Sequence, residues 1–129
     1  MILTNDLHEL QTQYDFIDSI VTNVYWSDDL MDLVIEVDYY WDYQEGRETT
    51  RELRLILRRC SNAIFSMPRI SENLNDEELA SYSLSWYTIL SSEFIVNDSI
   101  IKVLLYTMDY DTVWLAAECQ EVLLDGEKF

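Results

Sequence analysis

Carboxylates are the side chains of this sequence with the numbers and the spacing to do chemistry. The chain holds 25 Asp and Glu residues among its 129. Paired carboxylates catalyse glycoside hydrolysis and hold the divalent cations of nucleases. Asp28-Asp29 and Asp109-x-Asp111 are such pairs, but neither has the glycine and downstream Glu of a calcium loop. Because acids occur throughout the chain, these pairs carry little information, and we expect no metal and no other cofactor.

The other residue types that support catalysis are scarce. Phosphate-binding loops need clustered glycines, whereas Gly46 and Gly126 are the only two and lie far apart. His8 is the single histidine, so a zinc site or an activated nucleophile would rest on one residue near a helix start. Cys60 and Cys119 lack CxxC spacing and are interpreted as reduced, buried thiols, with a disulfide as the alternative. The sequence therefore predicts a binding protein and not an enzyme.

Net charge is the most informative property of the composition. Eight Lys and Arg against 25 Asp and Glu give a formal charge of −17. Nucleic acid and anionic membranes would repel such a chain, so we expect neither as a direct partner. The apolar runs are too short to span a membrane, and Met1 to Ile20 carry no Lys or Arg for a secretory signal. We expect a single domain, residues 1–129, in the cytoplasm.

The clearest structural signal begins at Met31, where apolar and polar residues alternate as in a strand with one buried face. The apolar face carries Met31, Leu33, Ile35, Val37, Tyr39, Trp41 and Tyr43. The opposite face carries Asp32, Glu36, Asp38 and Asp42, which leaves Tyr40 as the exposed aromatic candidate. Residues 47–59 alternate in the same way after a Gln44-Glu45-Gly46 loop.

A three-residue loop ending in a left-handed Gly46 would join these segments in a hairpin. The hairpin pairs residues whose numbers sum to about 90. On the core face the pairs are Leu33 with Leu57, Ile35 with Leu55, and Val37 with Leu53, and on the outer face Asp32 with Arg58 and Glu36 with Arg54. The apolar face would hold the hairpin together while the charges select its register.

Weaker patterns suggest the remaining elements. We predict a helix near residues 5–14 with Asn5 as N-cap, strands over 17–26, 82–90 and 100–106, and a loop with a helical turn over 68–81. Residues 113–124 fit either a helix or a closing hairpin after a turn at 108–111, and the hairpin is favoured. The predicted fold is mainly β, of the α+β type. It has an antiparallel sheet of about six strands, single or doubled into a sandwich, and a short N-terminal helix.

The distribution of charge points to a binding surface. Residues 1–46 contain 11 acids and no Lys or Arg, whereas residues 47–69 hold six of the eight basic residues. If those arginines pair with acids across the hairpin, the remaining acids leave a negative field that steers a cationic partner. Aromatic rings beside carboxylates can anchor Lys and Arg side chains. The predicted contact residues are Asp28, Asp29, Asp32, Glu36, Asp38, Tyr40 and Asp42.

Three segments of the first half of the chain give it a resemblance to a group of known proteins. They are the Phe16-Ile17-Asp18-Ser19-Ile20 opening, the acidic strand 33–38 and the arginine-rich strand 51–59. In these features the chain resembles the small acidic immunity proteins of bacterial polymorphic-toxin and contact-dependent inhibition systems. The resemblance implies a cytoplasmic inhibitor that binds a toxin, often a basic nuclease, and it transfers no individual site residue.

We therefore predict a non-enzymatic acidic protein that neutralises a basic protein partner. A related hypothesis is a DNA mimic, whose carboxylates imitate phosphate spacing. A carboxylate-based sugar- or metal-binding module or enzyme is an alternative, and it predicts a concave pocket with two or three converging acids. An oligomerisation domain with a merely solubilising charge is another, and it predicts an apolar patch or an open sheet edge.

Overall fold

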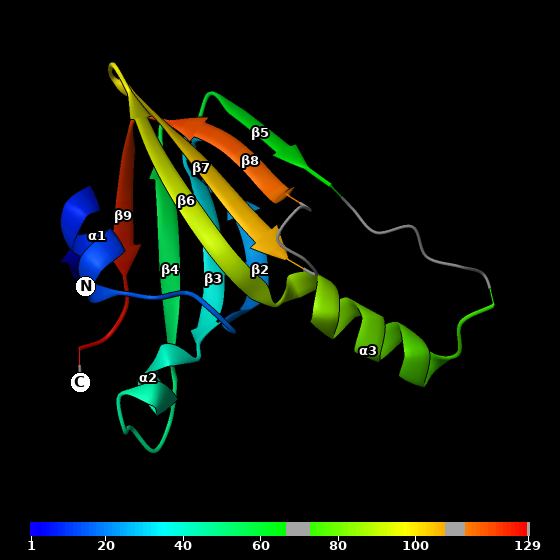
Figure 1. The fold of residues 1–129 in the computed structure, drawn as a ribbon. Helices are drawn as coiled ribbons and strands as arrows, with labels where there is room; N and C mark the ends of the chain where they lie inside the picture. The colour runs from blue at the N-terminus through cyan, green and yellow to red at the C-terminus, as the bar shows by residue number, and fades with distance from the viewer. Residues whose placement is uncertain (67–72, 108–112, 129) are drawn as a thin grey trace.

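Two antiparallel β-sheets make up most of the protein, as the sequence predicts. The computed structural model describes residues 1–66, 73–107 and 113–128, without the side chain of Tyr82. Within them lie nine strands and three helices, so the predicted mainly β fold with a short N-terminal helix is confirmed. The strands are more numerous than expected and form two sheets in two layers (Figure 1).

The first sheet has five strands in the order β1-β9-β4-β3-β2. Their bounds are β1 Ile2–Thr4, β2 Ile20–Trp26, β3 Leu33–Tyr39, β4 Arg51–Arg58 and β9 Glu121–Asp125. The predicted register of β3 and β4 is confirmed, with Leu33 opposite Leu57 and Glu36 opposite Arg54. The inward leucines of β4 are fully buried, because alternation turns every second side chain of the strand toward the second sheet.

The second sheet has four strands in the order β5-β8-β7-β6. Their bounds are β5 Asn62–Phe65, β6 Ile89–Asn97, β7 Ile100–Thr107 and β8 Val113–Cys119. The strand interpretation of residues 113–124 is confirmed, because β8 and β9 follow one another with only Gln120 between them. The chain passes from one sheet to the other at this bend, while the turn predicted at 108–111 and the Asp109-x-Asp111 pair lie outside the described residues.

Three helices flank the sheets. They are α1 Leu7–Gln13, α2 Trp41–Gln44 and α3 Asp76–Tyr87. The cap of α1 is Asp6 and not Asn5, since the Asp6 carboxylate accepts hydrogen bonds from the backbone N–H groups of His8 and Glu9.

The strand predicted over 82–90 is wrong, because most of it belongs to α3. The Asn75 side chain caps this helix by accepting a hydrogen bond from the Glu78 N–H. Three acids in the first turn interact favourably with the positive end of the helix dipole. Figure 1 shows the helix projecting away from the sheets, with its C-terminal end next to them. Trp86, near that end, is buried in the core. Serines alternate with apolar residues in this segment, so its sequence has the period of a strand although the segment is helical, and this misled the prediction.

The strand predicted from Met31 to Tyr43 is shorter at both ends. Met31 is 57% exposed in the turn before β3. Beyond Tyr39 the chain enters α2, so Trp41 is half-buried and Tyr43 is 50% exposed, and neither continues the core face of a strand. The connection to β4 is therefore longer than the predicted three-residue loop, although Gly46 does adopt the left-handed conformation with φ of 88°.

One core lies between the sheets. Its buried side chains come from both sheets and include Tyr39, Leu55, Leu105 and Trp114. Both cysteines are free thiols. Burial raises the pKa of Cys119 to about 12. No helix within the described ranges is long and apolar enough to cross a membrane.

Candidate acidic binding face

The outer surface of the five-stranded sheet gathers carboxylates along β3 and β4. Side chains alternate along β3, so Glu36 and Asp38 point away from the core that Ile35 and Val37 fill. The register places Glu52 of β4 directly opposite Asp38. The acidic face consists of Tyr25, Asp32, Glu36, Asp38 and Glu52. From Asp32 to Asp38 it extends about 20 Å at the usual rise of a strand.

A hydrogen-bonded network lies at the centre of this face. The carboxyl groups of Glu36 and Glu52 lie within hydrogen-bonding reach of each other, and this contact is the main cause that raises the pKa of Glu52. The Tyr25 hydroxyl also bonds to the Glu36 carboxyl group, and the Thr22 hydroxyl donates to the Glu36 backbone carbonyl at 3.3 Å. Burial, and then the Glu36 contact, raise the pKa of Tyr25. Two carboxyl groups thus lie side by side although their ionised forms repel each other.

The neighbouring arginines form their ion pairs away from the centre of the face. Arg54 lies opposite Glu36, but its ion pair is with Asp125 of β9, at 2.6 Å. Arg58 forms two ion pairs. One is with Asp32, at one end of the acidic face, at 3.8 Å, and the other is with Glu121 of β9, at 3.7 Å. Among the described residues, no Lys or Arg forms an ion pair with Glu36, Asp38 or Glu52. Arg54 still attracts both Glu36 and Glu52 electrostatically, so the negative charge at the centre of the face is offset in part but is not paired off.

Asp38 has a different partner. Its carboxylate accepts a short hydrogen bond from the Thr50 hydroxyl, next to the start of β4. The bond fixes the carboxylate without neutralising it. Asp38 is half-buried, so its charge is less well screened by solvent than that of a fully exposed acid.

The turn between β2 and β3 continues the acidic face with Asp28 and Asp29, both exposed. Asp29 accepts hydrogen bonds from the Ser27 hydroxyl at 2.6 Å and from the Met31 N–H at 3.1 Å, and these bonds hold the pKa of Asp29 below its usual range. Asp29 thus shapes the turn. Leu30 occupies the left-handed region with φ of 62° and is 73% exposed. Sequence reasoning missed this apolar tip, and it placed Met31 on the core face.

Asp42 does not belong to this face, which corrects the sequence prediction. It is fully buried, because α2 turns its side chain toward β4. Its two oxygens accept from Arg51 Nη2 at 2.9 Å, Arg51 Nε at 3.1 Å and the Arg51 backbone N–H at 2.9 Å. The pair joins the β3–β4 connection to the sheet, so Asp42 is a structural residue and inaccessible to a partner.

Tyr40 is exposed as predicted but lies at the start of α2, beyond the end of β3. Its ring packs edge-to-face on Tyr43 at 5.6 Å between centroids. Tyr25 is the aromatic residue that the structure places among the acids, through its hydrogen bond to Glu36. The strand predicted over 17–26 contains Tyr25, but the sequence pattern does not indicate that this strand lies beside β3.

Comparison with known proteins does not assign this chain to a family. No family model, curated protein or solved structure matches this chain. The site is therefore interpreted from its own geometry.

The geometry also bears on a carboxylate-based metal or sugar site. Within the described residues no three His, Cys, Asp or Glu side chains are grouped so as to hold a metal ion. A cleft of about 550 Å³ between β2, α3 and β8 has no described carboxylate in its lining. In a smaller cleft, Glu52 and Glu127 are accompanied by Arg51 and Arg54. Neither of these two clefts holds acids without arginine partners, whereas a third cleft, beside β6, has Asp15 and Glu93 and no Lys or Arg in its described lining.

Proposed function

We propose that this chain is a non-enzymatic binding protein that neutralises a basic protein partner, as immunity proteins neutralise nuclease toxins. The acidic face covers a cationic surface of that partner. The observation that carries the proposal is the side-by-side placement of Glu36 and Glu52 on β3 and β4, where no Lys or Arg forms an ion pair with either carboxylate among the described residues.

The physical reasoning starts from the cost of this arrangement. Like charges on neighbouring strands destabilise a sheet, and a chain with a net charge of −17 also repels itself. A Lys or Arg side chain of a partner placed between the two carboxylates would remove the local repulsion. The Tyr25 ring beside Glu36 offers an aromatic face to the same cation.

The turn between β2 and β3 offers an apolar contact beside the charged residues. Leu30 and Met31 are exposed apolar side chains directly beside Asp28 and Asp29. Well-packed apolar anchors surrounded by polar residues carry much of the energy of protein interfaces. We expect the acids to steer the partner and this turn to hold it.

The first experiment identifies the partner with matched baits. The immobilised domain is incubated at low salt with soluble proteins of its source organism, eluted in salt steps, and the eluates are identified by mass spectrometry. A triple variant E36Q/D38N/E52Q removes the centre of the face. A control variant E9Q/E77Q/E118Q removes three exposed acids from α1, α3 and β8.

A basic protein that binds the wild type and the control, and that the face variant fails to retain, is the expected result. Equal retention by all three baits would show that only net charge matters and would contradict the proposal. Retention of no basic protein by folded bait would contradict it as well.

A further inference from the structure

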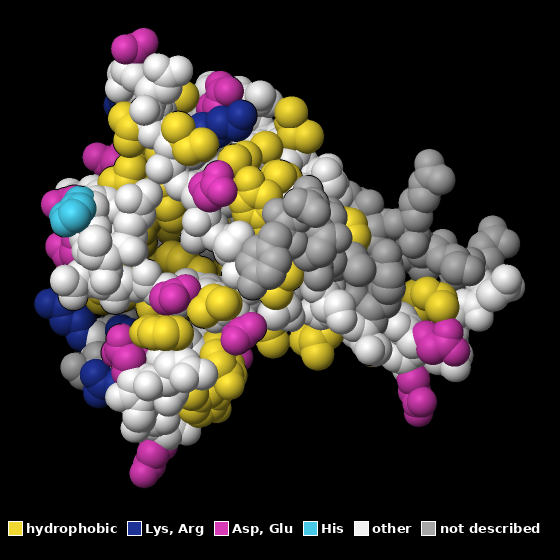
Figure 2. Space-filling model, in the orientation of Figure 1, with side chains coloured by type: hydrophobic (Ala, Val, Ile, Leu, Met, Phe, Trp, Pro, Cys, Tyr) yellow, Lys and Arg dark blue, Asp and Glu magenta, His cyan; other side chains and the backbone are white. Residues whose placement is uncertain are grey.

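A second binding site lies along the free edge of the four-stranded sheet. Strand β6 is at the end of that sheet and pairs with β7, and only its first residue, Ile89, also exchanges backbone hydrogen bonds with Asp18 and Ser19 among the described residues. A cleft of about 570 Å³ runs beside it, bounded on the other side by α1 and residues 14–17. This edge cleft has the volume of ordinary ligand sites. Figure 2 shows it as a hollow between α1 and β6, with hydrophobic side chains at its floor.

Backbone groups of β6 face into the edge cleft. In an antiparallel pair, alternate residues direct their N–H and C=O toward the neighbouring strand and away from it. The Phe94 carbonyl accepts a hydrogen bond from Gln11 Nε2 across the cleft at 3.2 Å, so Phe94 belongs to the set that faces away from β7. Ser92 and Val96, two residues to either side in a regular register, belong to the same set. These groups form a template for another strand, which would displace the exposed Gln11 side chain from the Phe94 carbonyl.

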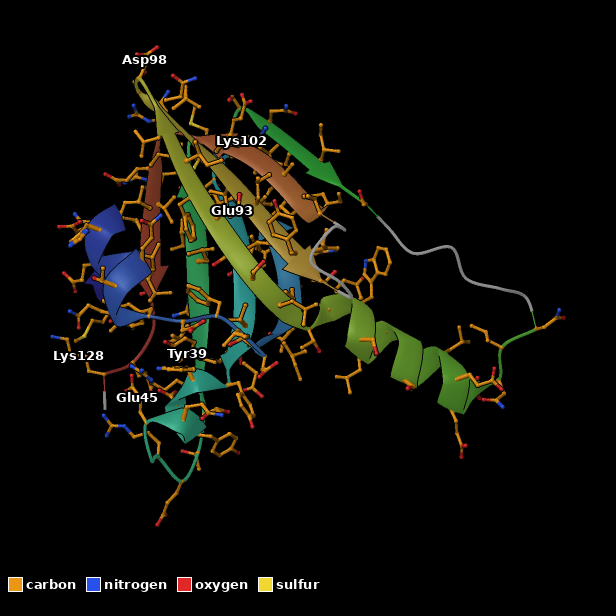
Figure 3. The ribbon with its side chains drawn as sticks, in the orientation of Figure 1. Tyr39, Glu45, Glu93, Asp98, Lys102 and Lys128 are labelled. Carbon is orange, nitrogen blue, oxygen red and sulfur yellow. The ribbon has the colours of Figure 1, made fainter. Side chains whose placement is uncertain are left out.

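The two sides of the cleft differ in chemistry. Toward the core, its lining includes Leu10 and Phe16, which are 2% and 4% exposed. Toward solvent lies Glu93, whose carboxylate is hydrogen-bonded to Tyr106 on the outer face of the sheet. Asp15 is the other charged residue in the described lining, and that lining contains no Lys or Arg. Figure 3 shows Glu93 on β6.

We propose that the edge cleft binds an extended protein segment in which apolar and basic residues alternate, added as a strand to β6. Side chains of an added strand point alternately to the two faces of the sheet. One set would contact the apolar floor, and the other would lie beside Glu93 in solvent. Backbone hydrogen bonds supply affinity in this mode, and the side-chain pockets supply selectivity. A second copy of this chain is disfavoured, because each copy carries a charge of −17.

The experiment uses a capped synthetic peptide, Lys-Val-Lys-Val-Lys-Val-Lys, and the whole chain. Its dissociation constant is measured by calorimetry at low salt. Amide hydrogen exchange is measured by NMR with and without the peptide. We expect protection of the Ser92 and Phe94 amides on binding. The Glu93 and Ile95 amides face β7 and serve as internal references.

Two substitutions at one position separate the edge from its side chain. Ser92→Pro removes an outward N–H without removing a β6–β7 hydrogen bond, and we expect it to weaken peptide binding at least about tenfold. Ser92→Ala keeps the N–H and should bind within about twofold of the wild type. Glu93→Lys tests the charge without any backbone change, and it should weaken binding of the Lys-Val peptide relative to the wild type.

Each outcome either supports or overturns the proposal. It is overturned if the Lys-Val peptide does not bind, if Ser92→Pro binds it as well as Ser92→Ala does, or if protection appears elsewhere. It is also overturned if light scattering shows a dimer that Ser92→Pro abolishes, because the occupant would then be a second copy. The variant E36Q/D38N/E52Q should leave peptide binding intact, so this site and the acidic face are tested independently.

Discussion

Replacing Asp42 by Asn tests whether the buried ion pair holds the β3–β4 connection in place. The substitution keeps the shape of the side chain and removes its charge. Asp42 is fully buried, and the Arg51 side chain is only 15% exposed, so the guanidinium would stay largely desolvated and lose its carboxylate partner while it keeps the hydrogen bond to the Glu127 carbonyl. Breaking such a pair costs about 3 to 5 kcal/mol. That is a large share of the roughly 5 to 15 kcal/mol by which domains are stable.

The assay is urea unfolding at pH 7 followed by tryptophan fluorescence, on Asp42→Asn, Arg51→Met and the double variant. The double variant should lose less than the sum of the single losses, by about 0.5 to 3 kcal/mol, because no unpaired charge stays buried. Asp28→Asn is the exposed control and should change stability by less than about 0.5 kcal/mol. A loss below about 1 kcal/mol for Asp42→Asn, or simple additivity, would refute the reasoning.

Three further substitutions probe the sheet that carries the acidic face. Burial opposes ionisation of Asp125, but hydrogen bonds from its basic partners outweigh it and hold the pKa of Asp125 below its usual range. Its contribution is therefore present at neutral pH and lost as pH falls through the folded pKa, so Asp125→Asn should cost about 1 to 2 kcal/mol at pH 7 and less at pH 2, by urea unfolding at each pH. Glu52 has a raised pKa, chiefly from its bond to Glu36, so the two repel only above that pKa. Glu52→Gln should stabilise the protein by about 0.2 to 1 kcal/mol at pH 7 and not at pH 3, and no gain at pH 7 would contradict this. Gly126→Ala would place a Cβ 2.3 Å from Leu53 Cδ2 in the core, and thermal unfolding should show a loss of about 1 to 3 kcal/mol, whereas an unchanged midpoint would rule out the clash.

The hairpin register could be predicted from sequence even though its loop could not. Alternation fixes which side chains of β3 and β4 face the core, and a slip by one residue would expose Leu33 and bury Glu36. The length of the connection has no such constraint, because Tyr39 pairs with Arg51 whatever the chain does between them. The short helix α2 lies in that connection. Because Asp42 belongs to this helix and not to a continued β3, it does not lie on the predicted face.

Other parts of the site depended on information that periodicity does not contain. The predicted register already placed Asp38 opposite Glu52, so the clustering of acids on two strands could have been found from sequence. The pairing of Arg54 with Asp125 could not, since it required β9 to lie beside β4. The exposure of Leu30 likewise depends on a left-handed turn that no glycine signals.

The most direct test of the central claim is the rate at which the purified partner associates with the domain as ionic strength changes. For the wild type, the association rate constant should fall steeply as salt is raised, because screening shortens the reach of the acidic face. For E36Q/D38N/E52Q it should be about tenfold lower at low salt and flatter with salt, while E9Q/E77Q/E118Q stays near the wild type. Equal rates and equal salt dependence for all three proteins would contradict the claim that the acidic face captures the partner.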